Sequence, residues 1–244
     1  DSGPSSPRTI STYWLYTFNG TNDDYNSWNP IDQNTPLKAG EGYTMKGTSG
    51  SIAITTNQNY VFKGKPNNGD ITLPIIAGND RLIGNPYASA IDADEFIKDN
   101  IKETINSKVG RNGVNVFNGA LYFWHHFGEE NSHILKEYVG GYATYTLMGG
   151  TEAISNDSRI NNNLSTGGKV PERYIPVNQG FFVNAYLPSS LLGTTASVDG
   201  GDIIFKNSQR VFQREVSNLG NGSVFFKPTI KKIIKTEEIS IDSR

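Results

Sequence analysis

Three histidines are the first candidates for metal chemistry in this chain. His125 and His126 are adjacent, and His133 follows a short way along. Adjacent residues of a strand point to opposite faces, so at most one of the pair could join His133 around a metal ion. We therefore interpret the histidines as structural residues and predict no metal site from them.

Two acidic clusters carry the oxygen ligands that calcium prefers. One consists of Asp23, Asp24 and Asn26, and the other of Asp199 and Asp202. Neither cluster has the spaced Asp-x-Asp-x-Asp-Gly pattern of a known calcium loop. Solvated turns are the favoured interpretation, so calcium is not indicated and no cofactor is predicted.

Carboxylates could also catalyse glycoside hydrolysis, which needs a pair of them at a set separation in space. Glu41, Glu129 and Glu130 stand beside expected turns, and nothing marks one of them as special. The sequence has no cysteine, no Gly-x-Ser-x-Gly nucleophile elbow and no phosphate-binding loop. The prediction is that the chain is not an enzyme. An enzyme whose site is assembled from scattered acids is the least favoured of three functional hypotheses.

Tyr25 and Trp28 are the residues most suited to ligand contact, because both stand in a polar loop at residues 19–36. There they could stack on sugar rings, as a carbohydrate-binding β-sandwich would require. The alternative is that Trp28 is tucked beneath its own loop as part of a satellite core. The second interpretation is favoured, and an exposed aromatic platform would reverse that preference.

The composition describes the scaffold that must position these residues. Glycine (26 residues) and proline (11 residues) are abundant, which favours many turns and short strands. Aromatic residues make up 11% of the chain and hydrophobic residues 36%, enough for a globular core. The net charge is −2 and the longest basic run is Lys231-Lys232, so nucleic acid is not expected as a partner. No apolar run is long enough for a membrane helix, so membrane insertion is not expected either.

Hydrophobic periodicity predicts a mainly β chain with one short helix. Trp14, Tyr16 and Phe18 alternate at the period of a strand, which is expected over 12–18. Asp92 precedes an apolar i, i+4 series that predicts a helix near residues 93–105. Further strands are expected at 37–46, 51–55, 59–63, 70–75, 114–117, 120–127, 142–147, 174–186, 202–205 and 223–226, and a long surface loop at 151–169.

An internal repeat predicts the domain organisation. The stretch around Gly42 aligns with that around Gly180, and each follows an aromatic strand candidate. We therefore expect two tandem β-sandwich-like (jelly-roll-like) modules, at residues 1–76 and 77–228, with the helix in the second. Residues 229–244 would form a tail or a linker to a following domain. In this scheme Gly42 and Gly180 occupy the same backbone position in two cores.

Six motifs, spread over most of the chain, carry a family resemblance. They are Ser5-Ser6-Pro7, Gly40-Glu41-Gly42-Tyr43-Thr44-Met45-Lys46-Gly47, the stretch from Leu82 to Ile97, Leu121-Tyr122-Phe123-Trp124, Gly140-Gly141-Tyr142-Ala143-Thr144-Tyr145 and Gln179-Gly180-Phe181-Phe182-Val183. Together they resemble a module of very large exported proteins of Flavobacteria and related Bacteroidetes. The resemblance implies export by the type IX secretion machinery, through a sorting domain outside this fragment, and a secreted or outer-surface location. It supplies no catalytic residues.

Gly84, Asn85 and Pro86 belong to this signature and are expected to have a structural role. The residue before a proline is held extended, and glycine adopts backbone angles that are closed to other residues. The three residues should therefore fix the corner that leads into the helix.

The leading hypothesis is a non-catalytic structural or adhesive module of an exported cell-surface or secreted protein. The runner-up is a carbohydrate-binding module of a protein that attaches to or degrades polysaccharide, with extracellular polysaccharide as its partner. The N-terminal residues lack a signal-peptide pattern, so the chain is expected to be a piece of a longer protein.

Overall fold

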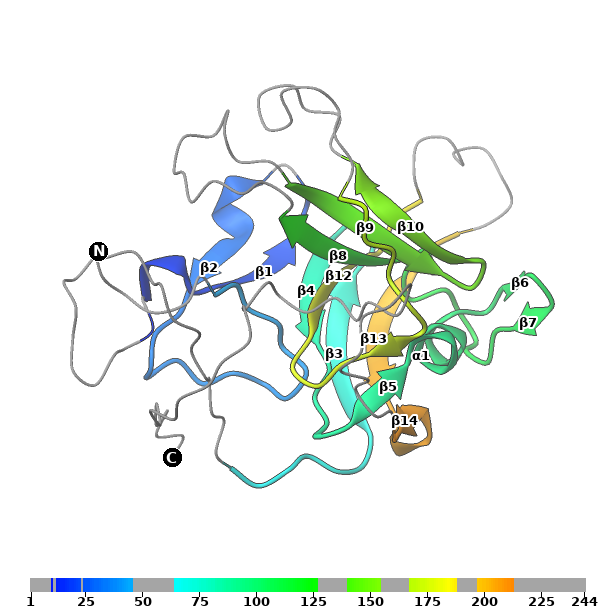
Figure 1. The fold of residues 1–244 in the computed structure, drawn as a ribbon, viewed down its shortest axis with the longest axis horizontal. Helices are drawn as coiled ribbons and strands as arrows, with labels where there is room; N and C mark the ends of the chain where they lie inside the picture. Colours follow the sequence, from blue (N-terminus) through cyan, green and yellow to red (C-terminus); the bar gives the residue numbers. More distant parts are fainter. Residues whose placement is uncertain are drawn as a thin grey trace.

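The computed structural model in Figure 1 has a mainly β fold with several antiparallel sheets and, among the residues it describes, one α-helix. The described residues are 10, 12–22, 24–45, 64–126, 140–154, 167–187 and 197–212. This architecture confirms the expected β-rich, sandwich-like fold class.

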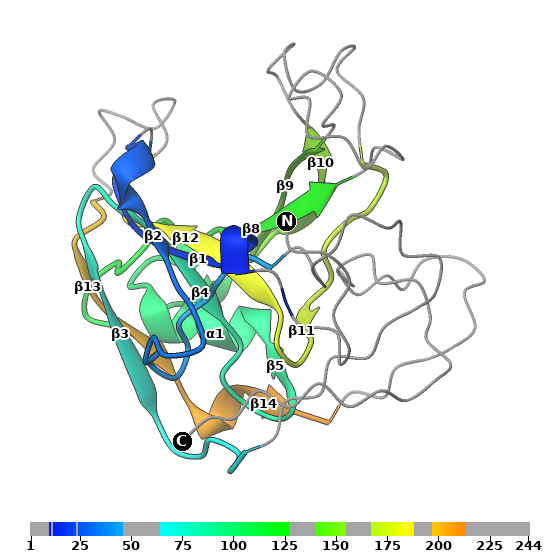
Figure 2. The same cartoon turned by 90° about the vertical axis from the view of Figure 1, so that its left-hand side faces the viewer.

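The largest element is a seven-stranded antiparallel sheet with the order β10-β9-β8-β12-β4-β1-β2. Its strands are β1 (Tyr16–Gly20), β2 (Trp28–Pro30), β4 (Asp80–Gly84), β8 (Leu121–His126), β9 (Gly140–Thr146), β10 (Gly149–Ile154) and β12 (Gly180–Asn184). Figure 2 shows that the sheet is strongly curved: β1 and β2 rise on one side of the central strands, and β9 and β10 rise on the other. One face of the sheet is therefore concave.

The remaining elements pack on the convex side, which we call the inner face. They comprise β3 (Ile71–Ile76) paired with β13 (Gly200–Phe205), and β5 (Ala90–Asp92) between β11 (Tyr174–Ile175) and β14 (Arg210–Val211). The helix α1 (Ala93–Asn100) lies among them, followed by the small hairpin of β6 (Thr104–Ile105) and β7 (Lys108–Val109). Short 3-10 turns are η1 (Thr12–Trp14), η2 (Tyr25–Ser27) and η5 (Asn207–Gln209).

Five phenylalanines form the centre of the hydrophobic core on the inner face. Phe96 of α1 stacks on Phe117 and Phe205, with ring centroids 5.9 and 4.8 Å apart. Phe181 of β12 meets Phe96 edge-on at 5.7 Å and Phe123 of β8 at 5.5 Å. Each of these side chains is at most 3% exposed. Their burial, which removes a large apolar area from water, joins the helix to the sheet.

The start of α1 follows the sequence prediction. The carboxylate of Asp92 accepts hydrogen bonds from the backbone N–H groups of Asp94 (3.0 Å) and Glu95 (3.3 Å), which the first turn of a helix leaves without partners. Asp92 therefore acts as the N-cap.

The end of α1 corrects the prediction, because the helix stops at Asn100 and does not reach residue 105. The buried side chain of Asn100 donates to the Phe96 carbonyl (2.8 Å) and the Ile204 carbonyl (3.0 Å), and it accepts from the Ile204 N–H (2.7 Å). Asn106 and Ser107 then have positive φ, which suits the hairpin turn and not a helix. A tertiary contact and a turn thus end the helix before its apolar pattern does.

Strands from the two predicted modules share sheets and a core. Gly20 of β1 pairs with Asp80 of β4, and Ile71 of β3 pairs with Phe205 of β13. Leu73 of β3 lies in the same hydrophobic cluster as the phenylalanines of the core. The described parts of residues 1–76 and 77–228 are therefore interleaved and are not consecutive modules. The predicted tail at 229–244 lies outside the described residues.

The other predicted strands have mixed outcomes. Those at 70–75, 120–127, 142–147 and 202–205 correspond to β3, β8, β9 and β13, while 174–186 divides into β11 and β12. The first strand begins after a 3-10 turn and spans 16–20, and residues 151–154 of the expected loop belong to β10. Residues 37–45 form no strand beyond a single bridge at Glu41, and 114–117 has no strand pairing, with Val114 41% exposed and residues 115–117 buried. The predictions at 51–55, 59–63 and 223–226 lie outside the described residues.

Candidate functional site

Three glycines of the predicted structural motifs meet at strand β4. The Gly42 N–H donates to the Leu82 carbonyl (3.1 Å), and Gly180 pairs with Gly84 across the β12–β4 ladder. A Cβ atom on Gly42 would lie 2.6 Å from the Ile83 carbonyl oxygen, whereas one on Gly180 would lie 3.6 Å from the same atom. Gly42 is therefore required by close backbone approach, and the two glycines are not equivalent.

Asn85 and Pro86 lie in the turn after β4, whereas Gly84 is the last residue of that strand and lacks the positive φ that only glycine adopts readily. The buried Asn85 side chain donates to the carbonyls of Ser89 (2.8 Å) and Pro176 (3.0 Å) and accepts from the Tyr87 N–H (3.0 Å). These hydrogen bonds hold the turn between the sheet and β5, which leads into α1. The signature thus has a structural role in the scaffold.

The concave outer face of the seven-stranded sheet forms a groove of about 610 Å³. Alternation along the strands decides which side chains line it, because successive residues point to opposite faces. On β12, Phe181 and Val183 are buried in the core while Phe182 and Asn184 line the groove. The same alternation on β8, β9 and β1 supplies the remaining floor of the groove.

A row of aromatic rings crosses the strands along this floor. Strand register places Trp28 opposite Phe18 and Phe182 opposite Tyr122. The ring of Phe18 lies 4.8 Å from that of Trp28 and 5.6 Å from that of Phe182, and Phe182 lies 5.7 Å from Tyr142. We call Trp28, Phe18, Phe182 and Tyr142 the aromatic row.

The curvature of the sheet brings aromatic rings of non-adjacent strands close together in this row. Trp28 on β2 and Phe182 on β12 are separated by β1 and β4, so in a flat sheet they would stand roughly 14 Å apart, given about 4.8 Å between strands. Their ring centroids are 6.0 Å apart. The outer face is therefore folded inward, and side chains of distant strands line a single concave surface.

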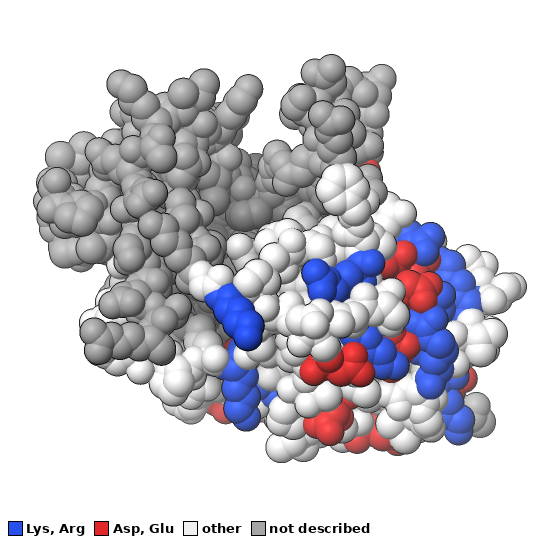
Figure 3. All heavy atoms as spheres, turned by 90° about the horizontal axis from the view of Figure 1, so that it is seen from below, with Lys and Arg blue, Asp and Glu red and all other residues white. Residues whose placement is uncertain are grey.

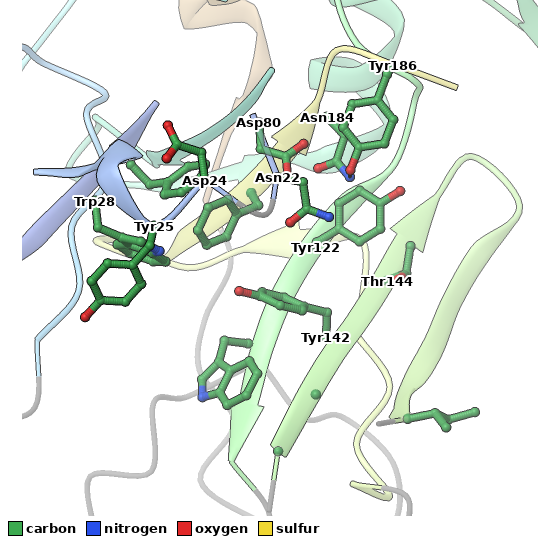
Figure 4. Close-up of a pocket in the computed structure, with 16 residues that line it drawn as sticks. Asn22, Asp24, Tyr25, Trp28, Asp80, Tyr122, Tyr142, Thr144, Asn184 and Tyr186 are labelled. Carbon is green, nitrogen blue, oxygen red and sulfur yellow. Dashed lines mark hydrogen bonds between the residues drawn. The ribbon is translucent and has the colours of Figure 1, made fainter. Parts of the chain in front are cut away.

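Partly exposed rings stand at both ends of the aromatic row. Trp124 and Tyr142 pair across β8 and β9, with centroids 5.2 Å apart, and are 40% and 41% exposed. At the other end Tyr25 of η2 is 87% exposed and lines the same groove as Trp28 (Figure 4). An aromatic platform is thus accessible at each end.

Polar groups gather along one side of the aromatic row, as Figure 4 shows for Asn22, Asp80, Asn184, Tyr122 and Tyr186. Asp80 pairs with Asn184 of β12 in the ladder, two positions along from Phe182. The Tyr186 hydroxyl donates to the Asp80 carboxylate and accepts from the Asn184 amide (3.2 Å). We call these five residues the polar row.

The tyrosines of the polar row keep their protons at neutral pH. Burial, the negative charge of Asp80 and the hydrogen bond to it raise the pKa of Tyr186 to about 12. Burial also raises the pKa of Tyr122, whose hydroxyl accepts a hydrogen bond from Asn118 (3.0 Å). The Tyr122 hydroxyl can therefore donate a hydrogen bond in the groove, whereas the proton of the Tyr186 hydroxyl is already donated to Asp80.

Two carboxylates line the groove, those of Asp24 and Asp80. Asp24 accepts hydrogen bonds from the Ser27 hydroxyl (2.9 Å) and the Asn26 N–H (3.0 Å), and these bonds lower its pKa. A glycosidase needs one carboxyl group whose pKa is raised, so that it can act as a general acid. Asp24 is instead suited to remain ionised and to accept hydrogen bonds.

Comparison with known families adds one match. The model of a domain of unknown function (DUF8693) matches residues 2–240. The chain belongs to this family. Searches of curated proteins and of solved structures find no match. The groove of this DUF8693 domain must therefore be interpreted from its own residues.

The DUF8693 domain brings together only some of the residues singled out in the sequence. Tyr25, Trp28 and Asp24 all line the groove. Asp199, whose carboxylate accepts from the Ser197 hydroxyl (3.2 Å), and the exposed Asp202 lie outside it. Asp23 is outside the described residues.

The candidate metal ligands and acids are dispersed. His125 is buried on the inner side of β8, His126 follows on the other side, and His133 lies outside the described residues. Glu41 forms an ion pair with Arg81 at 2.7 Å, while Glu129 and Glu130 are also outside the described part of the chain. Within that part, no group of three potential His, Cys, Asp or Glu ligands is found.

Sequence reasoning missed Phe182 and Tyr142 of the aromatic row, and Trp124 beside it. Trp124, Tyr142 and Phe182 were interpreted only as strand residues. They occupy outward positions in strands whose alternate residues are buried, and this signal could have placed them on one face.

Among the described residues, no helix is long and apolar enough to cross a membrane.

Proposed function

We propose that the chain is a non-catalytic adhesive module that binds extracellular polysaccharide in the groove on the outer face of its large sheet. The observation that carries this proposal is the aromatic row with the polar row beside it. It favours the carbohydrate-binding alternative over a purely structural module, because partly exposed rings line a concave surface.

Sugar chains present two kinds of surface that match this arrangement. Their ring faces carry C–H groups that can pack on aromatic side chains, and their edges carry hydroxyl groups that need hydrogen-bond partners. Sites for small ligands are generally concave, mostly apolar and fitted with a few well-placed polar groups. Trp28, Trp124 and Tyr142 would contact the ring faces, and the partly exposed Tyr122 and Asn184 would bond the hydroxyl groups.

The resemblance to modules of exported Bacteroidetes proteins supports the location of this function. A cargo of the type IX secretion machinery, carried by a sorting domain outside this fragment, would be released or held at the outer cell surface. Polysaccharide is an accessible partner there. The absence of Lys and Arg among the described groove residues argues against nucleic acid, whose phosphates require cations.

The test is direct binding to a panel of neutral and acidic polysaccharides, measured by affinity gel electrophoresis and calorimetry. Two of the three tryptophans line the groove, so binding should also change the tryptophan fluorescence. Trp28→Ala and Trp124→Ala should each weaken binding by about tenfold or more, equivalent to about 1.4 kcal/mol.

Phe212→Ala is the matched control, because this ring is 95% exposed and lies outside the groove. It should bind like the wild type. The proposal fails if no polysaccharide binds, or if both groove variants retain wild-type affinity. Bound chains should remain intact; release of reducing ends that disappears in Asp80→Asn or Asp24→Asn would show that the module is an enzyme.

A further inference from the structure

We propose that the groove selects uncharged polysaccharide over carboxylated or sulfated polysaccharide, and that Asp80 is the residue that sets this selection. This inference rests on the proposed function, since it names the chemical class of ligand for the same groove. It follows from the distribution of charge around the sheet.

The groove carries negative charge alone among its described lining residues. Its charged side chains are those of Asp24 and Asp80, and Lys, Arg and His are absent from the described lining. An anionic chain lying along the aromatic row would meet these carboxylates without a compensating cation. Like charges brought together in a partly desolvated site disfavour binding.

The cation nearest in sequence is directed away from the groove. Arg81 follows Asp80 on β4 and therefore points to the opposite face of the sheet. Its guanidinium is buried there, forms an ion pair with Glu41 at 2.7 Å and donates to the Pro74 carbonyl. Because consecutive side chains of β4 point to opposite faces, Asp80 lines the groove and Arg81 does not.

Several other cations lie around α1, which packs on the inner face of the sheet opposite the groove. Figure 3, which views the molecule from below, shows Lys and Arg side chains interspersed with Asp and Glu. The ion pairs there include Arg111 with Asp99 (2.7 Å) and Arg173 with Asp92 (2.7 Å). These cations are already paired with acids, so they do not offset the charge of the groove.

Asp80 lies at the wall of the groove, where its side chain is 7% exposed. Its strand is inside the sheet, with Gly20 on one side and Asn184 on the other, and the side chain of Ser27 occupies the space above Gly20. The Tyr186 hydroxyl donates to the Asp80 carboxylate, and this hydrogen bond contributes to the raised pKa of Tyr186. Charge interactions are strong in a partly desolvated site, so a carboxylate in the groove wall repels anionic groups of a ligand without direct contact.

The experiment compares one polysaccharide in two charge states. A neutral polysaccharide that binds is oxidised at its primary hydroxyl groups, so that carboxylates are introduced on an otherwise unchanged backbone. The wild type should bind the oxidised chain at least about tenfold more weakly. The difference should shrink as salt is raised from 10 mM to 1 M, because salt screens the repulsion.

Asp80→Asn removes the charge and keeps an oxygen acceptor, so it should narrow the difference between the two chains. Asp202→Asn is the control, since Asp202 is exposed on β13 outside the groove, and it should leave the difference unchanged. The salt titration of the wild type serves as an independent test if Asp80→Asn does not fold, as judged by circular dichroism.

The outcomes separate the two proposals. If neither form of any polysaccharide binds, the proposed function is overturned and this inference with it. If the oxidised chain binds as well as the neutral chain, or if only acidic polysaccharides bind, the selection is overturned while the binding function stands. If folded Asp80→Asn preserves the full difference, Asp80 is not the residue that sets it.

Discussion

The two faces of the seven-stranded sheet carry the same kinds of side chain and use them differently. Phe181 and Phe182 are neighbours on β12, yet Phe181 is 1% exposed beneath α1 while Phe182 lies in the groove between Phe18 and Tyr142. On the inner face, aromatic rings are enclosed by other elements. On the outer face the rings contact one another, and Trp124 and Tyr142 keep part of their surface open although Phe18 is buried, so aromatic content alone does not distinguish core from binding site.

The largest expected effect tests this contrast at adjacent residues. Phe181→Ala should lower the free energy of unfolding by about 3–5 kcal/mol, because it leaves a cavity among fully buried rings. Phe182→Ala should cost less than about 2 kcal/mol, since its ring is only partly buried, and should abolish most polysaccharide binding. Urea unfolding and binding assays measure both. Equal destabilisation by the two changes would mean that the outer face is also core.

The next effect concerns Gly42 and Gly180. The internal repeat predicts that they are equivalent, and both lie beside β4. Gly42→Ala should destabilise by about 1–3 kcal/mol, because the new Cβ would meet the Ile83 carbonyl at 2.6 Å and force a backbone shift. Gly180→Ala should stay within about 1 kcal/mol, since its Cβ would make an ordinary contact.

Thermal and urea unfolding of the two glycine variants measure how much stability each one loses. Matching losses would favour the symmetric roles expected from the repeat and would count against the geometry described for Gly42. A loss of stability in the Gly42 variant alone would show that close backbone packing beside β4 stabilises the sheet.

The smallest effect is a pH dependence that compares Tyr186 of the groove with Tyr87 of the core. Burial is the first cause in both cases, and each pKa is raised from 10.0 to about 12. Because the folded state retains protons that the unfolded state releases, this contribution to stability is complete below pH 10 and is lost as pH rises towards 12.

Phenolate absorbance followed against pH should therefore show late-titrating tyrosines. Tyr186→Phe should remove one of them and weaken the fall in stability above pH 10, while leaving the titration of Tyr87 in place. If Tyr186→Phe instead removed a tyrosine that titrates near pH 10, Tyr186 would ionise like an exposed tyrosine and would not donate to Asp80.

The elements were more predictable than their pairing. Alternation located seven of the fourteen described strands, and Asp92 marked the start of α1, because both signals are local; β4, which lies inside the large sheet, was not predicted. The end of α1 was missed because Asn100 is fixed by Ile204, a contact that no local pattern contains. The repeat around Gly42 and Gly180 suggested separate modules, whereas both segments lie against β4 in one sheet.

The groove was predictable only in part, for a related reason. Tyr25 and Trp28 were identified as candidates for sugar contact because they stand in a polar loop. Trp124 and Tyr142 were not, because strand alternation separates two faces without saying which of them other elements will cover. Asp80 enters the site only through its register with Asn184, which depends on pairing between distant segments.

The interleaved strand order also has a consequence for how the chain folds. β4 pairs with β12 through Gly84 and Gly180, β3 pairs with β13, and Asn100 bonds Ile204 across 104 positions. Proteins rich in such distant contacts have high contact order and fold slowly, because loop closure must precede any gain from pairing. A ribosome or translocon that has released only the first half of this chain has released no complete described sheet other than the small β6–β7 hairpin. Folding therefore waits for β12 and β13, and truncation before residue 205 should leave an aggregation-prone strand edge at β3 and no native state.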